Sequence, residues 1–121
     1  MNRREFAQWW AQAWSNRDVD AVVSRFADDV RFVSPRAAEV TGNPVVVGGE
    51  ALRDYWQRAV GAVESIVFEV EQVLEDAGGK HIVIVYTSNI DGLRRRACEF
   101  MQFDDEEKIT SAEAMHGCQL P

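Results

Sequence analysis

Residues 26–35, Phe-Ala-Asp-Asp-Val-Arg-Phe-Val-Ser-Pro, constrain the fold of this chain more than any other stretch. Side chains at residues 30–34 alternate with the two-residue period of a strand, and Pro35 ends the run. Asp28 and Asp29 suit a turn that leads the chain out of a helix and into this strand. We therefore expect helices before this stretch and, after one further helix, a sheet.

The residues before this strand predict a tight hairpin of two helices. In the first helix, bulky apolar residues recur at the three- and four-residue spacing of an amphipathic helix. These residues are Phe6, Trp9, Trp10, Ala13 and Trp14. Asp18 is of the type that caps a helix N-terminus, and it predicts a second, shorter helix.

The residues after the strand predict a long loop and a third helix. Residues 36–49 contain three glycines, and we expect a loop there with a short strand at residues 45–47. We also expect this loop to be the most mobile internal segment and to border the mouth of a pocket. An apolar stripe over residues 50–63 predicts the third helix.

The rest of the chain predicts an antiparallel sheet. The expected strands cover residues 65–75, 80–90, 93–103 and 108–117. Asp91-Gly92 is a strong signal for a two-residue hairpin, which places Ile90 opposite Leu93. Helices followed by a curved antiparallel sheet are the order of an α+β fold.

The last hairpin determines which side chains share a face with Glu99. If residues 104–107 form a four-residue loop, Glu99 pairs with Ala112, and Ala114 and His116 lie on the same face. Glu99 and His116 would then be about 13 Å apart, at about 3.3 Å for each strand residue. Two alanines beneath the helices leave space beside a carboxyl group, which favours a pocket.

Length and charge narrow the classes of protein. We expect one domain, spanning residues 1–121. A net charge of −7 lacks the positive surface of a nucleic-acid binder, so we exclude nucleic acid as a partner. No apolar run has the length of a membrane span or follows the first basic residues, so we expect neither a membrane partner nor export. Cys98 and Cys118 lack metal-ligand spacing, and we expect reduced thiols in a cytoplasmic protein.

Several motifs resemble the SnoaL-like branch of the nuclear transport factor 2-like superfamily. They are residues 14–20 (Trp-Ser-Asn-Arg-Asp-Val-Asp), residues 26–30 (Phe-Ala-Asp-Asp-Val), Ser34-Pro35, residues 49–56 (Gly-Glu-Ala-Leu-Arg-Asp-Tyr-Trp), Glu99-Phe100 and Phe103-Asp104. The resemblance implies a cone-shaped α+β barrel, in which a strongly curved, mostly antiparallel sheet holds the N-terminal helices. Members include ketosteroid isomerases, polyketide cyclases, dehydratases, epoxide hydrolases and proteins without enzymatic activity, so the fold leaves the activity open.

Of three functional positions in ketosteroid isomerases, only one holds a residue of the same kind in this chain. The position of their general-base aspartate holds Ser34, and that of their oxyanion-binding tyrosine holds Trp10. Glu99 occupies the position of their oxyanion-binding carboxylic acid, which is kept protonated by an apolar site. The resemblance therefore argues against steroid isomerisation by that mechanism.

Glu99 and His116 are the candidate catalytic residues. Glu99 lies among apolar neighbours, where an ionised carboxylate is costly. It is either an acid/base or ligand-binding group with a raised pKa, or it is held by an arginine or a backbone partner. His116 is either a proton-transfer or ligand-contacting group or a surface residue near the end of the last strand.

The candidate ligand-binding residues are Trp10, Trp14, Ser34, Tyr55, Trp56, Tyr86 and Ala112. The aromatic members form either a wall for a flat ligand or part of the core. Arg95 shares the face of Glu99 but lies beside the hairpin turn, where a solvated strand end is expected. Metal-ligand spacing, phosphate-binding glycine motifs and the residue order of a nucleophilic triad are missing, so we expect no metal and no cofactor.

These patterns predict a protein that binds a small, mostly apolar molecule. It is either an enzyme for cofactor-free isomerisation, cyclisation, dehydration or hydrolysis, or a non-catalytic binding or dimerisation module in which Glu99 is structural. The opposite face of the sheet predicts a homodimer, because it carries too much apolar surface for a monomer. The apolar residues of that face are Val83, Val85, Cys98 and Phe100. The family resemblance implies the same mode of pairing.

Overall fold

A computed structural model describes residues 1–121 as four helices and six strands. The helices are α1 (Arg3–Ser15), α2 (Val19–Val23), α3 (Pro35–Thr41) and α4 (Gly49–Gly61). The strands are β1 (Phe26–Val33), β2 (Val45–Val47), β3 (Ile66–Glu75), β4 (His81–Ile90), β5 (Leu93–Phe103) and β6 (Ile109–Gln119). The longest helices, α1 and α4, have 13 residues each, and neither could span a membrane.

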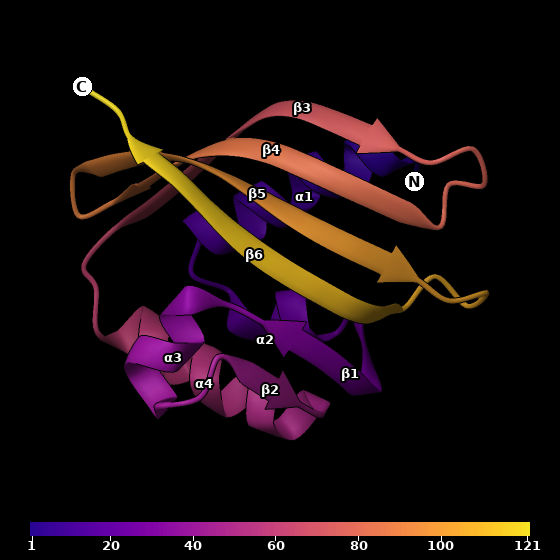
Figure 1. The fold of residues 1–121 in the computed structure, drawn as a ribbon, viewed down its shortest axis with the longest axis horizontal. Helices are drawn as coiled ribbons and strands as arrows, with labels where there is room; N and C mark the ends of the chain where they lie inside the picture. The colour runs from indigo at the N-terminus through magenta and orange to yellow at the C-terminus, as the bar shows by residue number, and fades with distance from the viewer.

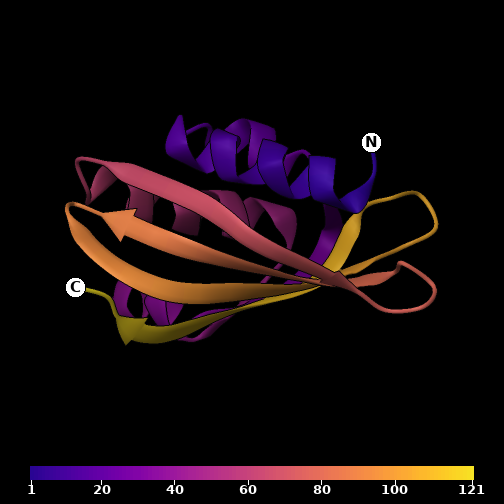
Figure 2. The ribbon, with the colours of Figure 1, turned by 90° about the horizontal axis from the view of Figure 1, so that it is seen from above.

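The strands form one curved, open sheet in the order β2-β1-β6-β5-β4-β3. All neighbouring strands are antiparallel except β1 and β6, which are parallel. The helices lie on the concave side, with α1 along β3 and α4 facing β1 and β2 (Figures 1 and 2). The expected α+β cone is therefore confirmed.

The first helix supplies much of the core between the sheet and the other helices. Asn2 caps it, and the Glu5 carboxylate accepts a hydrogen bond from the Asn2 backbone in return, so two free N–H groups are satisfied. Phe6, Trp10 and Trp14 lie on its buried face. Burial of each such side chain contributes roughly 1.5–3 kcal/mol. The tryptophan spacing thus anchors α1 inside the cone.

The predicted turn at Asp28 and Asp29 was wrong, since both residues lie within β1, which begins at Phe26. Both side chains are exposed, and the pairing of β1 with β6 is irregular between Phe26 and Arg31. A local irregularity of this kind lets two consecutive residues face solvent. The strand also ends one residue earlier than expected, at Val33.

Residues 36–49 do not form the expected long loop. Ser34 caps α3 by accepting a hydrogen bond from the Arg36 backbone N–H, and Pro35 occupies the first turn. The helix ends at Gly42, whose φ of 85° is the left-handed conformation that glycine adopts easily. The short strand expected at residues 45–47 is confirmed as β2.

The two β-hairpins differ in how well their register was predicted. Ile90 pairs with Leu93 across Asp91-Gly92, as expected. Glu99 pairs with Ala114, so the predicted partner Ala112 was wrong by two residues. An irregularity between Gln102 and Phe103 shifts the pairing. Because a shift of two residues keeps the alternation, the predicted faces still hold.

Candidate functional site

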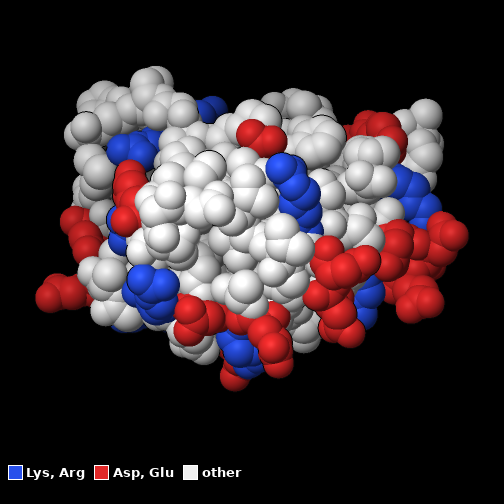
Figure 3. Space-filling model, turned by 60° about the horizontal axis from the view of Figure 1, so that its bottom comes forward, with Lys and Arg blue, Asp and Glu red and all other residues white.

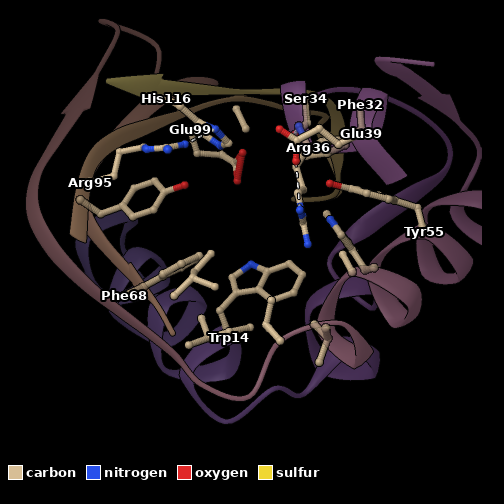
Figure 4. A pocket seen from close by; sticks show the side chains of 18 of the residues that line it. Trp14, Phe32, Ser34, Arg36, Glu39, Tyr55, Phe68, Arg95, Glu99 and His116 are labelled. Carbon is tan, nitrogen blue, oxygen red and sulfur yellow. Dashed lines mark hydrogen bonds and ion pairs between the residues drawn. The ribbon is translucent and has the colours of Figure 1, made fainter. Parts of the chain in front are cut away.

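A cavity of about 330 Å³ opens on the concave side of the sheet, at the lower end of the range for small-molecule pockets. Its apolar lining comes from α1, α4 and the sheet, and includes Trp14, Phe32, Trp56, Val60, Ile66 and Phe68. In Figure 4, Glu99 and His116 lie on one wall, Tyr55 lies across the cavity, and Trp14 lies opposite Glu99. The cavity is therefore mostly apolar with a few polar groups that converge on it.

Glu99 is the buried carboxyl group of this cavity. On β5 it lies between Ile84 of β4 and Ala114 of β6, and its residue is only 6% exposed. Its Oε1 atom has no hydrogen-bond partner in the protein. Loss of hydration raises the pKa of the Glu99 carboxyl group from 4.5 to about 8. Glu99 is thus mainly a neutral acid at pH 7.

Two tyrosines and a serine extend the polar part of the wall. Burial is the main cause that raises the pKa of Tyr55 to about 12, against a smaller lowering by the Ser34 hydroxyl group. Burial, followed by the charge of Glu99, also raises the pKa of Tyr86 well above its usual value. Both phenols therefore keep their protons at neutral pH.

His116 lies at the rim of the cavity, on β6. It pairs with Ala97, two residues from the Glu99–Ala114 pair, so the predicted separation of about 13 Å was too large. A diagonal neighbour of this kind lies about 7–8 Å away. Burial and the nearby Arg95 lower the pKa of His116, so its imidazole is neutral at pH 7.

The structure brings most of the predicted site residues to this cavity. Lining residues are Trp14, Ser34, Tyr55, Trp56, Tyr86, Glu99 and His116. Trp10 does not line the cavity, because its ring packs edge-on against Tyr86 in the core with 5.0 Å between ring centroids. Ala112 is also buried elsewhere, opposite Met101, and Ala114 takes the place expected for it.

Sequence reasoning missed the charged rim. Arg36 and Glu39 of α3 line the cavity and form an ion pair of 3.0 Å, but their segment was interpreted as a loop. The succession of Ser34, Pro35 and Gly42 was the signal for that helix. Arg95 lines the cavity too, where a solvated strand end was expected.

No group of three histidine, cysteine, aspartate or glutamate side chains is placed to hold a metal ion. The two cysteines are free. The polar groups that line the cavity are a neutral carboxylic acid, neutral phenols and imidazole, the Ser34 hydroxyl group, two guanidinium groups and the Glu39 carboxylate.

Solved structures share this fold. A SnoaL-like protein of unknown function from Burkholderia thailandensis is 26% identical, with 95% of this chain and 93% of that one covered and a TM-score of 0.82. The epoxide hydrolase/cyclase-like enzyme SalBIII is 21% identical, with coverage of 95% and 90% and a TM-score of 0.74. A steroid delta-isomerase from Pseudomonas aeruginosa is 19% identical, with coverage of 92% and 76% and a TM-score of 0.70. No curated protein sequence matches.

The motifs that resemble the SnoaL-like branch are spread along the same region that a family comparison identifies. The model of the SnoaL-like domain matches residues 6–112, from the first turn of α1 into β6. That match includes Glu99 and nearly all of the cavity lining. The chain belongs to the SnoaL-like domain family.

Proposed function

We propose that the chain binds a small, mostly apolar molecule in the cavity and that Glu99, as a neutral acid, donates a proton to an oxygen of that molecule. The proposal depends on one observation: a buried carboxyl group with an unpartnered Oε1 borders an apolar cavity of about 330 Å³. A buried polar atom without a partner is uncommon in folded proteins. A ligand oxygen would complete its hydrogen bonding.

The proposed chemistry needs no cofactor and fits the opening of an epoxide. Glu99 transfers its proton to the epoxide oxygen while that carbon–oxygen bond breaks. Water or a hydroxyl group of the substrate forms the new bond to carbon, and its proton returns to the Glu99 carboxylate. Water gives a diol and an internal hydroxyl gives a cyclic ether, so hydrolase and cyclase activities share one acid.

Two comparisons favour epoxide opening over isomerisation and dehydration. SalBIII, which has the same fold, is described as epoxide hydrolase/cyclase-like and acts in pyran ring formation. The steroid delta-isomerase also shares the fold. The resemblance to ketosteroid isomerases, however, places Ser34 and Trp10 at the positions of their base and their tyrosine. Ser34 caps α3 and Trp10 lies outside the cavity lining, so isomerisation and dehydration come second in the proposal.

Styrene oxide hydrolysis, followed by NMR at pH 7, tests the proposed acid. Glu99→Gln keeps the size of the side chain but cannot donate a carboxyl proton, so we predict that the rate falls by about 10²-fold or more. His116→Ala should cause a smaller loss, because His116 contacts the ligand at the rim. Glu113→Gln, on the exposed face of β6, is the matched control and should leave the rate unchanged. An unchanged rate in Glu99→Gln would contradict the proposal.

A non-catalytic binding module is the second candidate function. It is favoured by the mostly aromatic and aliphatic lining of the cavity, which can hold an apolar ligand without reacting with it. Calorimetry with the neutral bicyclic amide 2-naphthamide distinguishes the two. Binding of the amide without any acceleration of styrene oxide hydrolysis would establish binding alone and reject catalysis.

We further propose that the protein works as a homodimer in the cytoplasm. The convex face of the sheet carries Val83, Val85 and Cys98, which are half-buried, and Phe100, which is 38% exposed. Two copies would cover this apolar surface in a symmetric contact. The two free cysteines fit a reducing compartment.

A further inference from the structure

Two guanidinium groups reach the rim of the cavity from different elements. Arg95 comes from β5 and Arg36 from α3, and in Figure 4 they enter from opposite sides, with Glu99 and His116 between them. Both are partly buried. A cavity with a mostly apolar lining thus has positive groups at its entrance, although the chain as a whole has a net charge of −7.

The two arginines differ in how their charge is balanced. Arg36 forms an ion pair with Glu39 at 3.0 Å, and the Glu39 side chain is largely exposed. No carboxylate lies within 4.0 Å of Arg95, whose side-chain contact is with His116 Nδ1 at 3.4 Å. With neutral His116 and protonated Glu99, the charges that line the cavity sum to one positive charge, which comes from Arg95.

The polar groups beside Arg95 also favour an acceptor. An arginine side chain has only donors, so the Nδ1 atom of His116 accepts and its proton lies on Nε2. His116 Nε2 therefore offers a further N–H group. The Ser34 hydroxyl oxygen already accepts from the Arg36 backbone. The rim is thus rich in hydrogen-bond donors, and its one carboxylate, Glu39, is paired with Arg36.

We propose that the natural ligand carries a carboxylate, which Arg95 binds at the rim with help from Arg36. The planar guanidinium fork matches a carboxylate with two parallel hydrogen bonds. The rest of the ligand is an apolar, ring-sized body that reaches inward towards Glu99. Arg95 and Glu99 are four residues apart on β5, about 13 Å along the strand, which two fused rings with their substituents can bridge. This inference rests on the proposed binding function of the same cavity.

Calorimetry with a matched pair of bicyclic probes tests the inference. The probes are 2-naphthoate and its neutral analogue 2-naphthamide, measured at pH 7 and constant ionic strength. Arg95→Met keeps an unbranched apolar stem and removes the charge. Arg96→Met removes the same charge from the next residue of β5, whose side chain is exposed on the other face.

We predict that 2-naphthoate binds more tightly than 2-naphthamide to the unaltered chain. Arg95→Met should weaken the binding of 2-naphthoate by about ten- to a hundredfold, which is the usual contribution of a hydrogen bond to a charged group. The same variant should change the affinity for 2-naphthamide less than about twofold. Arg95→Lys should restore part of the loss, because it returns the charge without the fork.

The outcomes separate this inference from the proposed function. Equal affinities for the two probes would overturn the proposal that the ligand carries a carboxylate. An equal loss of 2-naphthoate affinity in Arg95→Met and Arg96→Met would overturn it too. Either result would leave the proposed binding function in place. Failure of both probes to bind a chain with an intact circular-dichroism spectrum would overturn the proposed binding function as well. Circular dichroism of each variant shows that a lost affinity is not lost folding.

Discussion

Burial of Glu99 makes the stability of the folded chain depend on pH. Its carboxyl pKa is about 8 in the folded state and 4.5 ordinarily, so the folded chain holds a proton that the unfolded chain releases between these values. The stabilisation is complete below pH 4.5 and is lost as pH rises towards 8. Over three pH units within this window, the contribution of Glu99 to the free energy of unfolding falls by about 4 kcal/mol.

We therefore predict that Glu99→Gln removes this dependence. Between pH 5 and pH 8 the free energy of unfolding of the unaltered chain should fall by about 4 kcal/mol relative to the variant, as measured by urea titration. Tyr55 and Tyr86 feel the charge of Glu99, but the pKa of both phenols lies above this pH range, so they do not titrate within it. His116, at the rim, is present in both chains. Parallel curves over this range would show that Glu99 is ionised in the folded state.

At the scale of single elements, α3 shows what sequence reasoning can and cannot find. The alternation around Asp91-Gly92 fixed one hairpin correctly, because the turn and both strands are local in sequence. The capping signals of α3 are also local, but the glycines after it favoured a loop. That α3 places Arg36 and Glu39 at the cavity is a tertiary fact that no local pattern contains. The mobility expected for this segment stays a prediction.

The β5–β6 hairpin shows a second limit. Alternation correctly placed Glu99, Ala114 and His116 on one face. Phe103 pairs with Ile109, so the turn has one residue more than expected, and the irregularity beside Phe103 adds one more. Together they moved the pairing by two residues, which brought His116 closer to Glu99 than expected. Such irregularities depend on how the turn fits its neighbours, so the face of a residue is easier to predict than its partner.

The convex face of the sheet carries the prediction of a dimer. Light scattering at micromolar concentration should give twice the 13.7 kDa mass of the chain. Phe100→Glu should return the monomer, because it places a charge in an apolar contact. The matched control is Val47→Glu on β2, which is 62% exposed and far from this face in the sheet order. A 13.7 kDa species alone for the unaltered chain would contradict the dimer.

For the whole molecule, the order of elements was enough to predict an α+β fold, and the family resemblance implied the cone. Helices rich in tryptophan need a concave apolar surface, and a long antiparallel meander supplies one. On the face shown in Figure 3, acidic and basic side chains border a broad area without charged groups. The full lining of the cavity could not be predicted from the sequence, because its walls come from elements far apart in the chain.

We propose that Glu99 holds its proton at neutral pH and meets the ligand with it. A pH titration of its side-chain carboxyl carbon by ¹³C NMR measures this directly, without and with 2-naphthamide. We predict a midpoint near pH 8 that rises further when the amide is bound, because its rings exclude the remaining water from the carboxyl group. A midpoint near the ordinary 4.5, unmoved by the amide, would contradict it.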